Sequence, residues 1–271
     1  MKQPILISIP HGGWKVAKEI EHIWALSEKD ALHDGDPFTA RIYDFADKVA
    51  CQLAMEYYRA VVDLNRAPDD IAPKNKDGVI KSHTCYDVEV YQPDCLPDDR
   101  LKQVLLDKYY FPYHRQLEAW LDRDDVRFGV DCHSMAAVSP PIEEDAGTPR
   151  PLICLGNLGD ADGEATPEFN RVTCSAEMIR FMCAEFAAVF RHEDLEMEVP
   201  DAATMNVPFS GGYITRQMGN RGIPFVQIEM SRALYIRKSS FNDETLEIDD
   251  RRIRDLNGKV WTVLEKVASN L

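Results

Sequence analysis

The stretch Ile5-Leu6-Ile7-Ser8-Ile9-Pro10-His11-Gly12-Gly13 decides the fold class, because a short apolar, β-branched run stops at a proline and a glycine pair. Such a run predicts a buried strand that ends in a loop. Similar runs along the chain predict further strands over residues 60–64, 128–132, 151–155 and 224–229.

Amphipathic patterns separate these runs. Apolar residues spaced by three and four predict helices over 36–58, 98–121, 178–189 and 253–267. Pro112 should kink or divide the second helix. Strands that alternate with helices predict an α/β fold, a three-layer α/β/α sandwich with a mostly parallel mixed sheet. Because no repeat or linker interrupts the pattern, we expect a single domain over residues 1–271.

The composition restricts the possible partners. The 271 residues include 31 Lys+Arg against 46 Asp+Glu, a formal net charge of -15, which argues against nucleic acid because phosphate backbones are held by Lys and Arg. No stretch approaches the ~20 apolar residues of a membrane span. The seven cysteines are scattered without a CxxC pair, as is typical of reduced thiols in a cytoplasmic protein. We therefore expect small solutes as partners, and the oligomeric state is not fixed.

Polar side chains follow four of the predicted strands. They are His11, Asn65 with Arg66, His133 and Glu229. Ligands of open α/β sheets bind in the crevice outside the carboxyl ends of the strands, so these side chains should converge on one site.

Two of these residues, His11 and His133, suggest a metal site. A catalytic zinc takes three protein ligands and a water, and neutral imidazole is a common ligand. No glutamate stands three residues after His11, where Trp14 occurs, so the nearest candidates for a carboxylate are Asp34 and Asp36. The alternative for either histidine alone is a hydrogen-bonded loop or core residue, and their occurrence at two strand ends brings the two interpretations nearer to equal weight.

Arg59 and Arg66 flank the predicted strand over 60–64. In a strongly acidic chain, an arginine at the mouth of a site indicates an anionic ligand, since guanidinium binds carboxylate bidentately. The alternative is a salt bridge to one of the 46 acidic residues.

Glu229 lies in an apolar segment, where desolvation raises a carboxyl pKa as a general base near neutrality requires. A buried pair with Arg216 or Arg232 is an alternative of similar weight. The glycine turn Gly211-Gly212 carries little information alone. The chain contains no GxGxxG nucleotide motif and no Gly-x-Ser-x-Gly around a serine.

Short motifs occur in a fixed order between about residues 5 and 235. They are Pro10-His11-Gly12-Gly13, Asp36, Arg59-Ala60-Val61-Val62-Asp63-Leu64-Asn65-Arg66, Pro112-Tyr113-His114, Asp131-Cys132-His133-Ser134-Met135, Pro208-Phe209-Ser210-Gly211-Gly212 and Gln227-Ile228-Glu229-Met230. This set resembles the N-formylglutamate amidohydrolase family. The resemblance implies a phosphorylase/hydrolase-like fold similar to the zinc exopeptidases and the aspartoacylase/succinylglutamate desuccinylase group. It also implies hydrolysis of N-formylglutamate to formate and glutamate in histidine degradation.

The resemblance also implies a role for each site residue. His11, Asp36 and His133 would bind one divalent metal ion, zinc. Apart from the resemblance, we expect Asp131, two residues before His133, to orient one of these ligands from behind. Glu229 would act as general base and acid, and Arg59 would polarise the scissile carbonyl. The substrate, a small anionic N-acyl amino acid, would contact four residues, with its carboxylate on the first two: Asn65, Arg66, Gly211 and Gly212.

Several alternatives stay open. The family often has serine at the position of Gly12, which leaves the acyl preference open, and His114 lies in a family motif without a role. A related metal-dependent hydrolase of another N-acyl amino acid or small peptide is one alternative function. A metal-free protein that binds an acidic amino acid is another. The sequence does not decide between zinc, manganese and cobalt, or whether the irregular segment 71–99 forms a lid.

Overall fold

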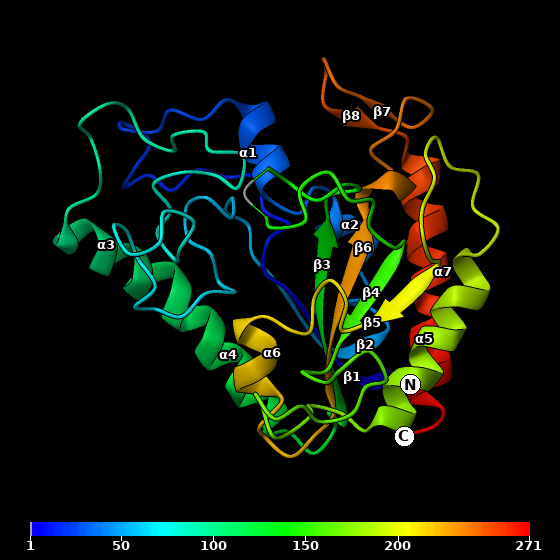
Figure 1. Ribbon diagram of the computed structural model, residues 1–271. Coiled ribbons are helices and arrows are strands. Elements are labelled where there is room, and N and C mark those ends of the chain that lie inside the picture. The colour runs from blue at the N-terminus through cyan, green and yellow to red at the C-terminus, as the bar shows by residue number, and fades with distance from the viewer. Residues whose placement is uncertain (1, 142) are drawn as a thin grey trace.

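A six-stranded sheet forms the centre of the molecule in the computed structural model, which describes residues 2–141 and 143–271 (Figure 1). The spatial order of the strands is β2-β1-β3-β6-β4-β5, and neighbours run parallel except for β4 and β6. The strands are β1 (Gln3–Ile9), β2 (Val49–Ala54), β3 (Phe128–Met135), β4 (Ile153–Gly156), β5 (Ala203–Met205) and β6 (Phe225–Ser231). The predicted mixed, mostly parallel sheet is confirmed.

Helices cover both faces of this sheet. In Figure 1, α5 (Ala176–Phe190) and α7 (Asp250–Ala268) lie on one side, and α4 (Phe111–Leu121) and α6 (Tyr213–Met218) lie on the other. The layers therefore match the predicted α/β/α sandwich. The remaining elements are α1 (Glu28–Asp34), α2 (Thr39–Ile42), α3 (Asp99–Leu105), a π-helical turn (Leu106–Tyr110), a 3-10 turn (Arg232–Leu234) and the hairpin β7 (Phe241–Asn242) and β8 (Glu247–Ile248).

Two hydrophobic cores lie on the two faces of the sheet. Along β1, Ile5, Ile7 and Ile9 face the core under α5 and α7, whereas Leu6 faces the core under α4 and α6. The same alternation in β3 and β6 sends residues 128, 130, 132, 226, 228 and 230 into the α5/α7 core. Side chains alternate across a strand, so His133 and Glu229 both lie on the opposite face.

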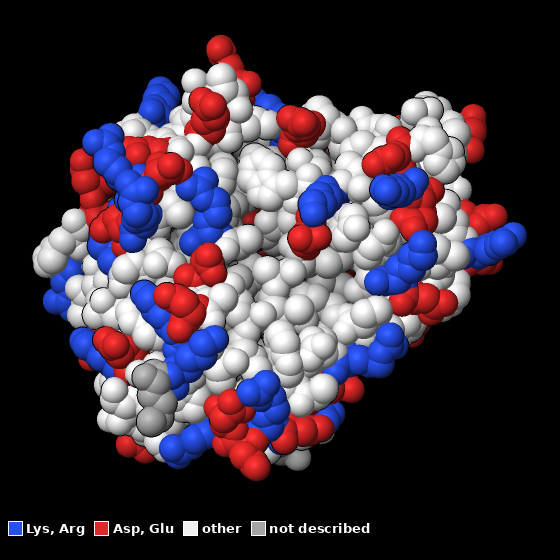
Figure 2. Space-filling model, turned by 180° about the vertical axis from the view of Figure 1, so that it is seen from behind, with Lys and Arg blue, Asp and Glu red and all other residues white. Residues whose placement is uncertain are grey.

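The surface, unlike the two cores, carries many charged side chains. On the face shown in Figure 2, basic and acidic side chains are interspersed around a central area of uncharged residues. Exposed ion pairs contribute little to stability, so the fold depends mainly on the two buried cores. Within the residues that the structure describes, we find no helix with the length and apolar content needed to cross a membrane.

The helix predicted over 36–58 is wrong. Only Thr39–Ile42 is helical there, and Val49–Ala54 forms β2, which pairs in parallel with β1. The apolar residues of the helical pattern, such as Phe38, Ile42, Phe45 and Val49, are nevertheless buried in one core. Pairing with a strand distant in sequence has therefore overridden the local helical pattern.

The strand predicted over 60–64 is also wrong. These residues are buried, but they form turns, and the position beside β1 is taken by β2. The backbone N–H of Asp63 donates instead to the carbonyl of Val79, at 2.8 Å. Asn65 and Arg66 consequently follow a buried turn. His133 and Glu229 lie inside β3 and β6, where they are register partners, and do not follow the strands.

The helix predicted over 98–121 is confirmed as a continuous helical path. It consists of α3, the π-helical turn and α4, and Pro112 lies in the first turn of α4. The π-helical turn ends two residues before Pro112, close to the kink or division that was predicted, where the proline cannot donate a backbone hydrogen bond.

Candidate active site

A cavity of about 350 Å³ opens at the carboxyl ends of β1, β3 and β6. This is the place where ligands of open α/β sheets bind. Every residue that the sequence assigned to the site lines this cavity: His11, Asp36, Arg59, Asn65, Arg66, His133, Gly211, Gly212 and Glu229. The structure therefore brings together side chains that are distant in the sequence, such as His11 and Glu229.

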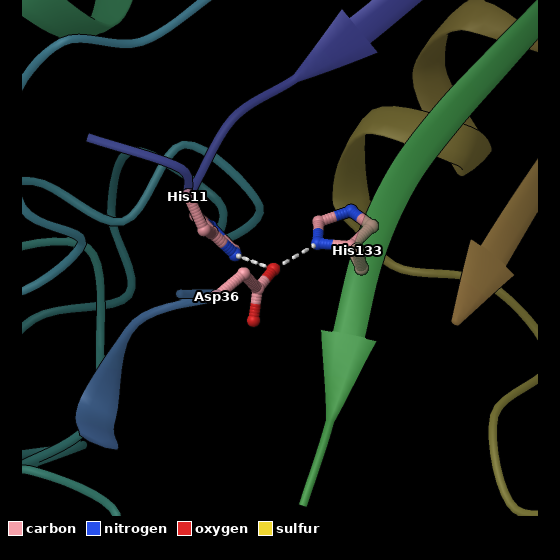
Figure 3. Close-up of side chains that lie close together, drawn as sticks. All are labelled: His11, Asp36 and His133. Carbon is pink, nitrogen blue, oxygen red and sulfur yellow. Dashed lines mark hydrogen bonds and ion pairs between the residues drawn. The ribbon is translucent and has the colours of Figure 1, made fainter. Parts of the chain in front are cut away.

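Three of these residues form a tight buried group, which Figure 3 shows in close-up. His11 comes from the loop after β1, Asp36 from the loop between α1 and α2, and His133 from β3. Oδ2 of Asp36 lies 3.3 Å from Nδ1 of His11 and 3.0 Å from Nδ1 of His133. One ligand atom of each residue lies within 4.8 Å of the other two, the spacing of a group that can hold a metal ion.

The outer nitrogens of both histidines face carboxylates. Nε2 of His11 lies 2.9 Å from Asp63 Oδ1, and Nε2 of His133 lies 2.9 Å from Asp131 Oδ2. A carboxylate in this position accepts a hydrogen bond from Nε2–H and fixes the ring, so that Nδ1 of each histidine is directed at Oδ2 of Asp36. Asp131 thus lies where the sequence reasoning expected it.

The sequence did not predict that Asp63 contacts His11, although Asp63 has the same sequence pattern as Asp131. Like Asp131, it is an aspartate inside an apolar run, two residues before a site residue, and it is fully buried. Besides its contact with His11, it accepts hydrogen bonds from Arg59 Nε at 2.7 Å and from the backbone N–H of Asn65 at 2.9 Å. One carboxylate therefore fixes three groups of the cavity wall.

The structure separates the two candidate carboxylates of the metal group. Asp34 is used elsewhere, because Lys81 Nζ lies 3.1 Å from its Oδ2 and the backbone N–H of Cys85 donates to its Oδ1 at 3.0 Å. Burial acts to raise the pKa of Asp36, but the hydrogen bonds with His11 and His133 outweigh burial and hold that pKa well below its usual range. An ionised carboxylate between two imidazoles is a donor set that suits a divalent ion.

Glu229 is buried in the wall beside this group. Burial raises the pKa of its carboxyl to about 7. Its Oε1 accepts a hydrogen bond from Gln227 Nε2 at 2.8 Å. Among the described residues it forms no ion pair with Arg216 or Arg232, so the alternative of a buried pair is wrong. Arg232 instead contacts Asp36, with Nη2 3.6 Å from Oδ1, and donates to the backbone carbonyls of His33 and Gly35.

The two predicted arginines both line the cavity and both have acidic partners. Arg59 Nε donates to Asp63, and Arg66 Nη2 donates to Asp77 Oδ2 at 2.8 Å. Arg59 and Arg66 therefore form ion pairs and also line the site, so the two interpretations of the sequence are compatible. The side chain of Arg66 remains 37% exposed, which leaves part of its guanidinium open to solvent.

Asn65 and the glycine turn are packed directly against each other. Oδ1 of Asn65 accepts a hydrogen bond from the backbone N–H of Ile214 at 2.8 Å. A Cβ atom on Gly212 would lie 2.1 Å from Asn65 Nδ2, so no larger residue fits there while Asn65 keeps this position. The glycine is thus required by close packing of two segments that both line the cavity.

The segment 71–99, which the sequence left as a possible lid, forms one wall of the cavity. It contributes Asp77, Cys85 and Tyr86 to the lining. Lys81 anchors this segment, since it is fully buried and forms ion pairs with both Asp34 and Asp77. The buried lysine was not predicted, because a lysine in an irregular polar segment gives no sequence signal of burial.

His114 lies outside the cavity and supports it from behind. Its Nε2 donates to the backbone carbonyl of Leu64 at 3.0 Å, directly before Asn65. Burial lowers the pKa of this imidazole to about 4, which keeps the ring neutral near neutral pH.

Comparison with known proteins identifies the family. Residues 3–236 match the family model described as N-formylglutamate amidohydrolase. This chain belongs to the N-formylglutamate amidohydrolase family. The match includes every residue of the candidate site, which confirms the resemblance noted in the sequence.

Relatives of this family member include two N-formylglutamate deformylases. The protein from Pseudomonas putida is 29% identical over 249 residues, 87% of this chain and 83% of that protein. The protein from Pseudomonas aeruginosa is 28% identical over 243 residues, 86% of this chain and 82% of that protein. The crystal structure of an N-formylglutamate amidohydrolase from Ralstonia eutropha JMP134 has a TM-score of 0.72 at 21% identity, covering 100% of this chain and 96% of that chain. The fold is therefore shared with a solved member of the family.

Proposed function

We propose that this family member is a metal-dependent amidohydrolase that cleaves N-formylglutamate to formate and glutamate. The observation that carries the proposal is the buried group of His11, Asp36 and His133, which lies in one cavity with Glu229 and two arginines. The two deformylase relatives support the choice of N-formylglutamate as substrate.

The donor set fits one divalent ion, for which we propose zinc. Two imidazole nitrogens and one carboxylate are the ligands of many catalytic zinc sites, and the carboxylates of Asp63 and Asp131 behind the two histidines complete the usual surroundings. A bound ion of this kind would supply Lewis-acid chemistry, which polarises an amide carbonyl and lowers the pKa of water.

Glu229 would move the proton. With a pKa raised to about 7 by burial, its carboxylate can take a proton from the water as the water oxygen attacks the formyl carbon. The same carboxyl group then gives this proton to the amide nitrogen as the C–N bond breaks, which releases formate and the free amine of glutamate. Gln227 holds Oε1 and leaves Oε2 for the proton.

The arginines would hold negative charge. Arg59 is fixed through Nε by Asp63 and through Nη1 by the backbone carbonyl of Asp34, and its other N–H groups would stabilise the oxyanion that develops on the carbonyl. At the open mouth, Arg66 would bind a substrate carboxylate together with Asn65, whose Oδ1 is bound to Ile214 so that Nδ2 is the available donor. Gly211 and Gly212 would line the space that the substrate occupies.

We also propose that the protein acts in the cytoplasm, in histidine degradation. The seven cysteines are all free, which supports a reducing compartment.

The direct test is a panel of N-formyl, N-acetyl and N-succinyl glutamate incubated with the purified protein, with formate and free glutamate both quantified. We expect equal amounts of formate and glutamate from N-formylglutamate and much slower release from the other two. Preferred cleavage of another N-acyl amino acid would make the protein a related hydrolase of different specificity. Binding of glutamate without any turnover or bound metal would identify a binding protein and refute the proposal.

A further inference from the structure

Five arginines line the cavity, and they differ in whether an acidic residue neutralises them. Three have aspartate partners: Arg59 with Asp63, Arg66 with Asp77, and Arg232 with Asp36. In the described part of the chain, neither Arg150 nor Arg216 forms an ion pair. Arg216 is exposed and its guanidinium lies 5.0 Å from the ring of Phe169, so solvent and an aromatic face accommodate its charge.

Arg150 differs from Arg216, because it is buried from solvent as well as lacking an ion pair. It is only 5% exposed, and its side-chain hydrogen bond goes to the hydroxyl of Ser139, at 3.1 Å, which in turn donates to Oδ1 of Asp145, so no carboxylate contacts the guanidinium directly. Its Nε is buried and has no hydrogen-bond partner among the residues described. Burial of a charge without a contacting counter-ion raises the free energy of the folded protein. An anion bound from outside the chain would lower it, so this guanidinium is a candidate anion-binding group.

The position of Arg150 is fixed by its surroundings. Its backbone N–H donates to the carbonyl of Ala137 at 3.0 Å, which ties it to the end of β3, two residues beyond Met135. Its guanidinium lies 4.8 Å from the ring of Phe209, in the segment that leads to the Gly211-Gly212 turn. The cation is thus held between two walls of the cavity, and a preorganised arginine loses little entropy when it binds a carboxylate.

The charge of Arg150 also acts across the cavity. Burial raises the pKa of Tyr86, on the wall formed by the segment 71–99, and the charges of Arg232 and Arg150 oppose that rise. The cation therefore contributes a positive potential to the space where the substrate would lie.

N-formylglutamate carries two carboxylates, and the proposed function assigns Arg66 with Asn65 to one of them. We propose that Arg150 binds the other, the side-chain carboxylate, and so selects an acidic amino acid over a neutral one. This inference rests on the proposed function, in which the formyl group faces His11, Asp36 and His133. Arg66 and Arg150 come from different segments, the turn after residue 64 and the loop that follows β3, so each can hold one end of a dicarboxylate.

The test compares kcat/KM for N-formylglutamate and N-formylglutamine, which have nearly the same shape and differ by the side-chain charge. We expect the wild type to prefer N-formylglutamate by about 10- to 100-fold, the range that a hydrogen-bonded charge supplies. Arg150→Met should remove most of this preference by slowing N-formylglutamate alone. Arg150→Lys keeps the charge without the bidentate fork, so it should retain an intermediate preference and serves if the methionine variant does not fold.

Arg216→Met is the matched control, because it removes the other cavity arginine that lacks an acidic partner. It should keep the wild-type preference. An equal loss on both substrates in Arg150→Met would contradict the inference, as would loss of preference in Arg216→Met with the preference of Arg150→Met intact.

If the wild type hydrolyses neither compound, the proposed function fails, and calorimetric binding of L-glutamate and L-glutamine then tests Arg150 separately. Tighter binding of glutamate that disappears in Arg150→Met supports the inference. Equal binding of the two amino acids to the wild type overturns it.

Discussion

The buried imidazole of His114 gives a prediction whose size can be worked from the structure. Its Nε2–H donates to the carbonyl of Leu64, next to Asn65, and burial lowers its pKa from 6.5 to about 4. We expect the free energy of unfolding to fall as the pH falls through this range, because the unfolded chain then binds a proton that the folded chain excludes. The stability that the neutral His114 contributes is fully present above pH 6.5, the pKa of the unfolded chain, and is lost as the pH falls towards about 4, the pKa of the folded chain.

The expected size follows from the two pKa values. Between about pH 7.5 and about pH 4.5, the unfolded imidazole gains nearly a full proton and the folded one only a fraction, which amounts to about 2.5 kcal/mol. Urea unfolding of the wild type and of His114→Gln, at several pH values, isolates this contribution. Glutamine keeps an Nε2–H donor for the carbonyl of Leu64 but does not titrate.

The difference between the two proteins in free energy of unfolding should therefore change by about 2.5 kcal/mol across this pH range, in the direction that favours the variant at low pH. His22→Gln, which replaces a histidine exposed to solvent, controls for the His-to-Gln exchange itself. Parallel pH profiles for the wild type and His114→Gln would refute the interpretation of His114 as a neutral buried donor.

Three further predictions concern the cavity itself. Glu229→Gln should lower kcat by about 10²- to 10⁴-fold, with the circular dichroism spectrum unchanged, because the amide cannot take a proton; a kcat close to that of the wild type would exclude Glu229 as the base. Asp63→Asn should weaken zinc binding by about 10- to 100-fold in a competition assay with a chelator, since His11 loses its carboxylate partner; unchanged affinity would leave that contact without a role in metal binding. Arg66→Ala should raise KM for N-formylglutamate by about 10- to 100-fold with a smaller change in kcat, and a constant KM would remove Arg66 from carboxylate binding.

The sequence was sufficient for the parts of the fold that depend on local patterns. The apolar runs at Ile5–Ile9 and Phe128–Cys132 are buried strands, and the periodic segment that ends at Val267 is a helix. The helical pattern over 36–58 failed because β2 exists only through its pairing with β1, a contact between segments about 45 residues apart. Short apolar segments are ambiguous between helix and strand until such a partner is known.

The candidate site was also predicted only in part from the sequence. His11, His133 and Glu229 could be predicted to converge, because parallel strands end at the same edge of a sheet and these residues lie at or near the carboxyl ends of β1, β3 and β6. Asn65 and Arg66 reach the same cavity from a buried turn that the sequence wrongly predicted as a strand. The contacts that hold the side chains of the site could not be predicted, since they join distant segments: Asp63 with His11, Asp77 with Arg66, and Asp34 with Lys81. An aspartate in the sequence gives no information on which of several cations it will meet. Arg150 was missed for the related reason that nothing local distinguishes a buried arginine from an exposed one.

The central claim is that a metal ion held by His11, Asp36 and His133 is required for cleavage of N-formylglutamate. The most direct measurement is formate release by protein stripped with a chelator, and then titrated with zinc, with metal content determined in parallel. The stripped protein should lose at least about 99% of its turnover and regain it at about one equivalent of zinc. Release of formate at the full rate by protein shown to contain no metal would contradict the claim.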